Sequence, residues 1–490
     1  MLNQWGVFFP LYLRSFDSSK EPVGSARLIP RRCSRRKGKT MKFNSACKAL
    51  AVASAAAMLL AGCGGGSGTD ASDKSGAGFD ENAKTTISLA GWSLDMTPEF
   101  KTLADGFHKA HPNVTINIKQ YSADDYDKQL TADISSGAQP DVFPVKTMVK
   151  YVTYADSQGL ADISDIAKGF QGDKHIDLNG YDHDGKYFAL PYRSDTWVLF
   201  YNKDMFHKAG VEEPSAKWTW DDYTKAAKEL KEKLPEAGYD GNSVYPMYMH
   251  NWQSVVQSFA LAQSGKSADD TFLKGDFSYM EPYYKRALEW QDEKYTIDWN
   301  TSFTNKVQYQ PQFGTQKAAM MPMGTWYAAV LVNQQQTGEA DKFSWGMAPA
   351  PQNPDKKLPS TPITYGSPTS LAISSKISGQ KLAAAKEFVK WSVGQGGAVE
   401  LAKISTTPAY IDDKVTEAYF SSEGMASDQA SKDAWSKHDR KMEVPVSGAS
   451  DTINSILKDA HSSIMTGAKS PSDGLKEARQ NVKDQGILDE

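Results

Sequence analysis

The feature that most constrains the fold is a regular alternation of short apolar runs with segments of helical periodicity, which begins near residue 84. A short apolar run predicts a buried strand, and apolar residues repeating every three or four positions predict a helix with one buried face. In chain order the pattern predicts strands at 86–90, 114–118 and 141–143, separated by helices at 98–110 and 124–136. Strands that alternate with helices in this way form a parallel α/β sheet.

The same alternation restarts in the middle of the chain, with an apolar run at 197–201. Further helices are expected at 220–234, 253–262 and 280–293, followed by a strand at 371–373 and a helix at 382–393. At ~150 residues per domain, a chain of 490 residues is expected to hold about three domains or two large ones. The restart favours two α/β lobes over one very large sheet.

An export signal precedes this globular part. Residues 41–62 begin with Met41-Lys42, continue through an apolar stretch too short to span a membrane, and end in Ala61-Gly62 directly before Cys63. This ending resembles the lipobox of bacterial lipoproteins, which implies that the Cys63 thiol is acylated and becomes the new N-terminus. The alternative is an ordinary cysteine after a conventional cleavage site.

Residues 1–40 precede that signal and carry many charges just before Met41, a second good start. We therefore interpret residues 1–40 as the product of an upstream start codon that was assigned in error. Twin-arginine export through Arg35-Arg36 is the alternative, although Lys37-Gly38 occupy the place where that motif has an apolar pair.

The segment after the expected cut predicts a flexible tether at residues 63–83, because it is rich in Gly, Ser and Asp and has no apolar period. The other two cysteines, Cys33 and Cys47, lie upstream of the cut, so no disulfide and no Cys-ligated metal is expected in the mature protein. Residues 1–62 hold most of the excess basic charge, which leaves the body strongly acidic. An acidic body without a basic run repels phosphate backbones, so nucleic acid is not an expected partner.

Catalytic motifs with fixed spacing are absent from the sequence: there is no HExxH, no GxSxG and no GxGxxG. Gly265-Lys266-Ser267 lacks the upstream glycine of a phosphate loop, and the residues around Asp182 lack the ligands of a calcium loop. We therefore expect no catalytic residue, metal or cofactor. A pair of carboxylates for glycoside hydrolysis stays open, because folding rather than spacing would bring such a pair together.

Several segments together resemble the extracellular solute-binding proteins of ABC importers, in the oligosaccharide branch (family 1) that includes maltose-binding protein. The segments that carry the resemblance are GWSLDMTPEFKTLADGFHKAHPNVTI, SGAQPDVFPV, DGKYFALPYRSDTWVLFYNKDMFHKAGV, WTWDDYTKAAKEL, QKAAMMPMGTWYAAVL, SWGMAPAP, YGSPTSLAIS, AAAKEFVKWSV and GAKSPSDGLKEARQNV. Each is weak alone, but their order and spacing extend over nearly the whole mature body.

The resemblance implies an α/β, two-lobed periplasmic-binding-protein fold (type II-like), with a ligand cleft at the hinge between the lobes that closes on binding. The chain is then expected to cross between lobes near 191–193, near 346–351 and around 397–410. The expected N-terminal lobe comprises 84–192 and 348–400, and the C-terminal lobe 193–347 and 401–490.

A sugar has a flat apolar C–H face and a rim of hydroxyls, so a sugar site needs aromatic rings together with charged or amide groups. Trp92 and Lys146 follow predicted strands, and Trp252 lies in a loop before a helix. The resemblance adds four more ligand contacts: Asp195 at the offset of a hinge-side carboxylate, Trp326 at a sugar-stacking position, and Tyr365-Gly366 as first-lobe contacts. Four further tryptophans lie in or at the starts of helices and are expected to pack in the core: Trp218, Trp220, Trp290 and Trp391.

The resulting hypothesis is a non-catalytic receptor, lipid-anchored on the extracytoplasmic face of the cell membrane, that captures an oligosaccharide and delivers it to the permease subunits of an ABC importer. We expect a monomer that needs no cofactor and reaches the membrane only through its lipid. Two alternatives stay open: a binder of another solute, such as a peptide, polyamine or metal, and a secreted glycoside-active enzyme. The sequence names neither the sugar and its linkage nor the permease.

Overall fold

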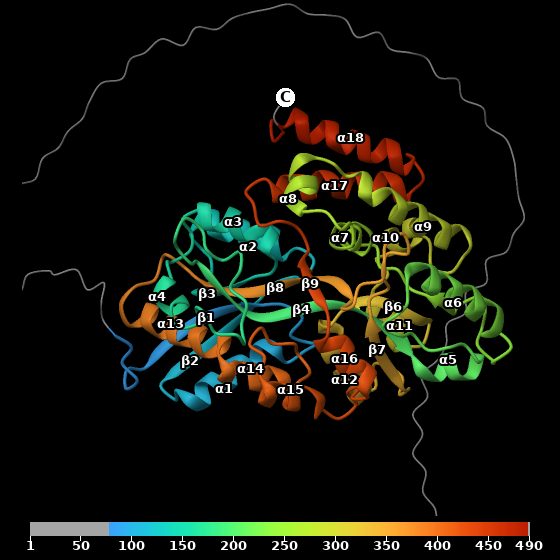
Figure 1. The fold of residues 1–490 in the computed structure, drawn as a ribbon. Helices are drawn as coiled ribbons and strands as arrows, with labels where there is room; N and C mark the ends of the chain where they lie inside the picture. The colour runs from blue at the N-terminus through green and yellow to red at the C-terminus, as the bar shows by residue number, and fades with distance from the viewer. Residues whose placement is uncertain (1–77, 489–490) are drawn as a thin grey trace, which may run out of the picture. The chain divides into compact units, whose positions relative to one another are not determined.

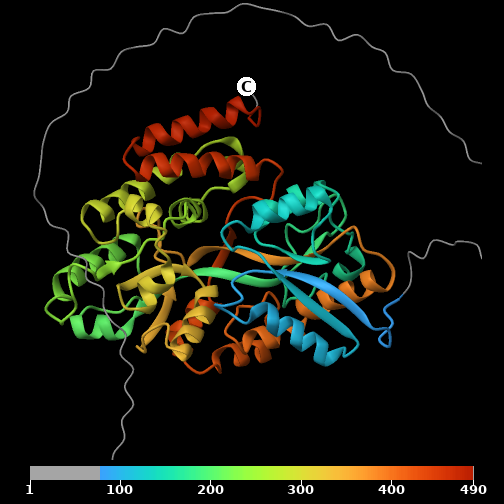
Figure 2. The ribbon, with the colours of Figure 1, turned by 180° about the vertical axis from the view of Figure 1, so that it is seen from behind.

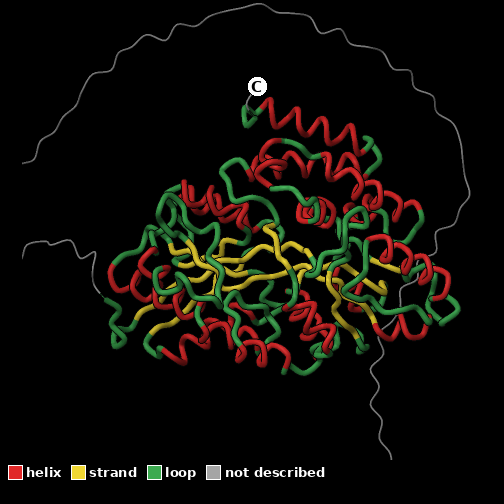
Figure 3. The backbone as a smooth tube through the Cα atoms, in the orientation of Figure 1, coloured by secondary structure: helices red, strands yellow, loops and turns green. Residues whose placement is uncertain are grey.

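One long strand connects two groups of strands in the computed structural model, which describes residues 78–488. This strand, β4 (Ala189–Asn202), pairs antiparallel with β8 (Ile363–Ile373) through residues 189–196. Through residues 197–202 it pairs instead with β6 (Ala318–Gly324) and β7 (Trp345–Pro349). The described strands follow the order β2-β1-β3-β8-β4-β6-β5, with β7 beside β4 and β9 beside β8, and they form the yellow layer in Figure 3.

The other strands are β1 (Thr85–Gly91), β2 (Val114–Gln120), β3 (Val142–Val145), β5 (Tyr245–Met247) and β9 (Asp439–Met442). The helices before β4 are α1 (Glu99–Ala110), α2 (Tyr126–Ser136), α3 (Met148–Asp156) and α4 (Ser164–Ala167). Those between β4 and β8 are α5 (Lys203–Ala209), α6 (Trp220–Lys233), α7 (Ser254–Ala262), α8 (Ala268–Thr271), α9 (Glu281–Asp292), α10 (Trp299–Thr304), α11 (Tyr309–Gly314) and α12 (Trp326–Thr337). Those after β8 are α13 (Gly379–Val393), α14 (Gln395–Ala402), α15 (Asp413–Phe420), α16 (Gln429–Ser436), α17 (Ser450–Met465) and α18 (Pro471–Asp484).

The first hydrophobic core forms around β1, β2 and β3, as the sequence pattern predicts. β1 pairs parallel with β2 along its whole length and also with β3, and α1 and α2 make the two connections. Figures 1 and 2 show α1 on one face of these strands and α2 and α3 on the other. Apolar side chains of α1 fill the space against the sheet, with Phe100, Leu103 and Phe107 fully buried. We call the elements around this core the first lobe.

A second core gathers the C-terminal half of β4, strands β6 and β7, and helices from both the middle and the end of the chain. We call the elements around it the second lobe. Trp220 and Trp290 are 2% and 5% exposed in this core, and Trp218 packs against it, as predicted. Trp391 packs against the first core. Helix α17 also lies against α3 of the first lobe, where Lys150 and Asp451 form an ion pair of 2.6 Å.

Some local predictions differ from the structure. The strand expected at 197–201 extends from Ala189 to Asn202, because the expected crossover at 191–193 is itself extended chain inside β4. The helix expected at 98–110 starts one residue later, as α1 at Glu99, and the Thr97 hydroxyl that precedes it has no hydrogen-bond partner. Residues 78–83, assigned to the tether, contact the first lobe: Asp80 and Gln380 share two hydrogen bonds of 3.0 and 2.8 Å.

The predicted artefact at 1–40, the signal peptide at 41–62, the acylated Cys63 and the tether up to residue 77 lie outside the described residues. Among residues 78–488, no helix combines the length and the apolar character needed to cross a membrane.

Candidate functional site

Five aromatic rings of the second lobe gather where β4 passes from one lobe to the other. We call them the aromatic cluster: Trp197, His250, Trp252, Tyr309 and Trp326. Trp252 is 38% exposed, and its ring lies 4.3 Å from that of His250, 5.8 Å from that of Tyr309 and 6.3 Å from that of Trp326. An aromatic face that stays in contact with solvent is what stacking on the apolar face of a ligand requires.

The chain around Trp326 explains how its ring is held. Trp326 is the first residue of α12, and its ring folds back over Gly324 so closely that a Cβ there would lie 1.8 Å from the ring. Its indole Nε1 donates a hydrogen bond of 3.2 Å to the Tyr309 hydroxyl. The Trp326 ring is therefore fixed by its hydrogen bond to Tyr309 and by the absence of a side chain at Gly324. Residue 324 can only be glycine while the ring keeps this position.

The loop that carries Trp252 is fixed from behind. Trp299 donates from Nε1 to the Asn251 carbonyl at 3.0 Å, and the amide of Gln253 donates to the Asn454 carbonyl at 2.9 Å. His250 is 3% exposed, and burial lowers its pKa to about 3, so its imidazole stays neutral. The position of Trp252 is thus set by packing, whereas its exposed face remains available.

The first lobe contributes Trp92, which follows β1 directly, as predicted. Its ring is 6% exposed and packs edge-on against Phe100 and Tyr126. Two cations lie over that ring, with Lys146 Nζ at 5.3 Å and Arg193 Cζ at 5.9 Å from the centroid. Lys146 donates to the Ala123 carbonyl at 2.7 Å, and burial is the main cause that lowers its pKa. In this structure Trp92 is thus mainly an edge-packed ring with positive charge above it.

Asp195 lies inside a buried network at the hinge rather than on an open surface. We call this the hinge network: Glu99, Tyr192, Arg193, Asp195 and Thr325. Arg193 donates to Glu99 of α1 at 2.6 Å, and its Nε lies 2.8 Å from Asp195 Oδ2, an ion pair whose geometry is not that of an aligned hydrogen bond. The Thr325 hydroxyl donates to Asp195 Oδ1 at 3.0 Å. The network therefore connects α1 of the first lobe to the residue that precedes Trp326.

Burial dominates the electrostatics of this network. Asp195 is 2% exposed, and burial raises its pKa to about 6, opposed by the charge of Arg193 and reinforced by that of Glu99. Arg193 has two carboxylates beside it, which raise its pKa. Both oxygens of Asp195 contact protein groups and the side chain is buried, so a direct contact with a ligand would require the surrounding side chains to move.

Tyr365 and Gly366 lie behind the aromatic cluster. Tyr365 is fully buried, its ring stacks on Trp197 at 5.2 Å, and its hydroxyl donates to the Ser254 carbonyl at 3.0 Å. Gly366 was predicted as a ligand contact, and the structure gives a separate reason for a glycine there: a Cβ would lie 2.1 Å from the Asp195 carbonyl oxygen of β4. Gly366 allows β4 and β8 to pair at the hinge.

The two lobes meet near these side chains. The Met96 carbonyl, in the loop after Trp92, accepts a hydrogen bond of 3.0 Å from Asn333 of α12. Burial raises the pKa of Tyr309 to about 12, and the charges of Arg193, Asp195 and Asp124 also act on that phenol. The charges of Arg193 and Asp195 in β4, and of Asp124 before α2, therefore act on the Tyr309 hydroxyl. Aromatic rings and buried charged groups are thus both present where the lobes meet, and together they suit a ligand with an apolar face and a polar rim.

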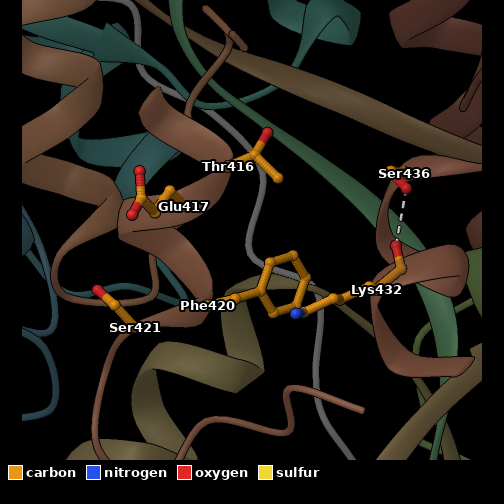
Figure 4. Close-up of a pocket in the computed structure, with 6 residues that line it drawn as sticks. All are labelled: Thr416, Glu417, Phe420, Ser421, Lys432 and Ser436. Carbon is orange, nitrogen blue, oxygen red and sulfur yellow. Dashed lines mark hydrogen bonds between the residues drawn. The ribbon is translucent and has the colours of Figure 1, made fainter. Parts of the chain in front are cut away.

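Two hollows of the described chain lie elsewhere. One, of about 330 Å³, lies between α15 and α16 and includes Phe420, with Lys432 Nζ 5.7 Å from its ring (Figure 4). The other, of about 340 Å³, is formed by the loop after α4 around Asp173. Neither contains a predicted site residue. Among residues 78–488, no three His, Cys, Asp or Glu side chains converge as a metal site requires.

Sequence reasoning missed several residues of this region: Glu99, Arg193, His250, Tyr309 and Thr325. Arg193 lies within a segment that the sequence analysis quoted, but nothing near it in sequence reveals Glu99, which is 94 residues away. His250 could have been suspected from its place beside Trp252. Tyr309 carries no local signal, since its role depends on a contact with Trp326 of another helix.

The family model of the bacterial extracellular solute-binding proteins matches residues 93–399, which is more than half of the chain. Curated binding proteins of Brucella abortus are 29% identical over 140 residues, and the match spans 32% of their length. A multiple sugar-binding protein of Streptococcus mutans is 23% identical over 364 residues, which cover 72% of this chain and 79% of the relative.

Among solved structures, a sugar transporter from Rhizobium etli in an open conformation is 29% identical, with a TM-score of 0.67. The alignment covers 81% of this chain and 99% of that one. The predicted fold class is thereby confirmed: the chain has the α/β, two-lobed architecture of these binding proteins.

Proposed function

The chain belongs to the bacterial extracellular solute-binding protein family, and from this premise we propose that it captures an oligosaccharide outside the cytoplasm and delivers it to an ABC importer. The observation that carries the sugar assignment is the exposed ring of Trp252, which belongs to a cluster with Trp326 and Tyr309. Stacked rings bind the C–H face of a sugar, whereas a peptide or a polyamine would be recognised by backbone pairing or by carboxylates. The sugar-binding names of two relatives agree with this assignment.

The ligand contacts that we propose fall into two groups. Trp252, whose ring is exposed, and Trp326, which is half-buried beside it in the aromatic cluster, stack on sugar rings. Trp92 and Lys146 approach the ligand from the first lobe. Asp195, Tyr365 and Gly366 are retained as site residues in a supporting position, since each is held by protein contacts behind the exposed rings.

Calorimetric titration tests the assignment. Both hydrophobic cores lie within residues 78–488, so a protein that starts at Gly64 contains them without the lipid. It is titrated with glucose, maltotriose, cellotriose, raffinose and glycerol 3-phosphate, and each mixture is then analysed for products. We expect saturable binding of an oligosaccharide that stays intact. Binding of glycerol 3-phosphate alone would contradict the sugar assignment, and cleavage of a sugar would make the protein an enzyme.

We also propose that Cys63 carries the lipid that holds the receptor at the outer face of the membrane. The proposal is supported by the sequence around the cut and by the family, whose members are extracellular. Cells fed a labelled fatty acid should incorporate the label into the wild type and not into Cys63→Ser. Labelled Cys63→Ser would contradict the anchor without affecting the sugar assignment.

A further inference from the structure

Glu443 occupies the segment that leads from the hinge strands into the last two helices. It directly follows β9, whose final residue, Met442, pairs with Gly366 of β8. The next residues belong to different cores: Val444 is buried in the second, and Val446 packs against the first. In Figure 1, β9 lies beside β8 and β4 between the two groups of helices. Glu443 is therefore positioned at the junction of the lobes.

The Glu443 carboxylate has no hydrogen bond and no ion pair with any residue in 78–488. The cations beside it on the chain are used elsewhere, since Arg440 contacts Ser194 and Asp177, and Lys441 pairs with Asp439 at 2.9 Å. Its side chain is only partly exposed, yet its oxygens are not among the fully enclosed unpaired atoms. The carboxylate thus keeps an opening through which a molecule can reach it.

The surroundings of Glu443 connect it to the aromatic cluster. Met442 pairs with Gly366, so Glu443 lies one residue beyond a strand pair that includes Tyr365 and Lys441. Its charge acts on the Tyr365 phenol, whose hydroxyl is already bonded to Ser254. Ser254 is two residues from Trp252, and the Tyr365 ring stacks on Trp197. Glu443 therefore lies next to a residue that supports the aromatic cluster from behind.

A half-buried carboxylate that receives no donor from the protein depends on water for its hydrogen bonds, and proteins usually supply a partner for such a group. Here the described chain supplies none. The partner can instead come from the ligand, because a sugar presents pairs of adjacent hydroxyls that both oxygens of one carboxylate can accept. Such a contact fits a sugar unit that stacks on the neighbouring ring.

We propose that Glu443 is a ligand-binding residue of this receptor, and that its carboxylate accepts hydrogen bonds from two adjacent hydroxyls of the sugar unit that stacks on Trp252. The inference rests on the proposed sugar-binding function and makes it more specific, since it assigns the polar end of one sugar subsite. It also predicts which ligands are rejected: sugars without a free vicinal diol on that unit bind poorly.

The pH dependence of binding distinguishes this contact from a structural role. Burial raises the pKa of free Glu443 to about 7, and hydroxyl donors in the complex would lower it. The affinity for the sugar should therefore rise with pH until Glu443 is ionised in the free protein, near pH 7, and should stay constant at higher pH.

Other charged groups near the hinge do not reproduce this change. They comprise Tyr365, whose pKa is raised far above neutrality, Arg440 and Lys441, which form ion pairs with Asp177 and Asp439, His438, with a pKa of about 4, Asp195, with a pKa of about 6, and the ion-paired Asp451 of α17. Only Asp195 titrates near the same range. A variant that removes Glu443 alone isolates its contribution from that of Asp195.

The test titrates glucose, maltotriose, cellotriose and raffinose into the mature chain from pH 5.5 to 8.5, in the wild type, Glu443→Gln, Glu443→Asp and the control Glu417→Gln. Glu417 is an exposed carboxylate on α15. For the sugar that the wild type binds, we expect at least tenfold weaker binding by Glu443→Gln and loss of its pH dependence around 7. Glu443→Asp should bind less tightly but keep that dependence, and Glu417→Gln should match the wild type. In protein labelled with carbon-13 in its glutamate residues, the Glu443 carboxyl resonance should also shift when the sugar is added.

The outcomes separate this inference from the function on which it rests. If the wild type binds a sugar and Glu443→Gln binds it equally well with the same pH profile, the inference is overturned and the receptor function stands. If Glu443→Gln binds weakly but melts at a much lower temperature than Glu443→Asp, and the labelled resonance does not move, Glu443 is structural and the inference is overturned again. If the wild type binds none of these sugars, the proposed function fails and the inference fails with it.

Discussion

Asp195→Asn tests the electrostatics of the hinge network. Both oxygens of Asp195 are engaged, by Arg193 at 2.8 Å and by Thr325 at 3.0 Å, and an amide of the same shape can keep both contacts. What changes is the charge. Burial holds the pKa of Asp195 at about 6, above its ordinary value of 3.8, so the ionised form is disfavoured in the folded protein. The amide should therefore be tolerated best at the pH where the wild type must ionise this group.

The magnitude follows from the two pKa values. A group whose pKa is raised on folding stabilises the protein fully below its unfolded pKa and loses that contribution as the pH rises through the folded pKa. With a pKa of 3.8 in the unfolded protein and about 6 in the folded protein, Asp195 adds about 2 kcal/mol to the free energy of unfolding at pH 4.5 and close to zero at pH 7.5. Relative to the wild type, Asp195→Asn should thus be about 2 kcal/mol more stable at pH 7.5 than at pH 4.5.

Urea unfolding at both pH values, followed by tryptophan fluorescence, measures this difference, and Glu417→Gln is the control for a change of net charge. Other carboxylates titrate over the same range, but they do so in both proteins and cancel from the comparison. An equal loss of stability at pH 4.5 and 7.5 would refute the reasoning, because it would mean that Asp195 is ionised throughout and acts as a constant partner of Arg193.

Further predictions concern the same region. Arg193→Met leaves Glu99 and Asp195 buried without their cation, so we expect a loss of roughly 3–5 kcal/mol in urea unfolding at pH 7.5 and a smaller loss at pH 5; equal losses would contradict this. Gly366→Ala places a Cβ against the β4 backbone and should lower stability by at least ~2 kcal/mol, which thermal melting measures, whereas Gly448→Ala, where the nearest atom to an added Cβ would lie 3.9 Å away, is the matched control for added bulk. Trp252→Ala removes an exposed ring, so calorimetry should show at least tenfold weaker sugar binding with a melting temperature within a few degrees of the wild type, and unchanged binding would remove Trp252 from the site. Trp326→Ala should abolish detectable binding in the same assay while the protein stays folded, and unfolding would mean that the ring is a core residue.

Local pattern was sufficient for most elements of the fold. The alternation of strands and helices before residue 145 predicted β1 to β3 with α1 and α2, because each has a period that a short window of sequence contains. The prediction was less successful where an element belongs to both lobes. β4 continues through Pro191 and Arg193, and its first half is held by β8, a strand more than 160 residues later, so no window around it contains the cause.

The candidate site could also be predicted only in part from the sequence. A tryptophan in a loop or after a strand can be recognised from sequence, and Trp92 and Trp252 were selected on that ground, whereas Trp326 was selected from the family resemblance. The sequence does not reveal whether such a ring is exposed to solvent. Trp252 is 38% exposed and Trp92 is 6% exposed, because Phe100 and Tyr126 cover the Trp92 ring. Asp195 and Tyr365 were predicted as ligand contacts, and in the structure their oxygens are used by Thr325 and Ser254, from distant segments.

By itself the sequence determined the period of each element, the identity of the apolar faces and the order of the segments that resemble a binding-protein family. These properties depend on neighbours within one or two helical turns or on the linear order of motifs. The tertiary structure decided which groups lose water and what replaces it. Arg193 forms ion pairs with Glu99 and Asp195, while Glu443 has no partner among the described residues. The local sequence around Arg193 and Glu443 does not distinguish these two outcomes. The physical reason is that desolvation and pairing are set by atoms a few ångströms away in space, and at a hinge built from strands β4, β8 and β9 those atoms come from opposite ends of the chain.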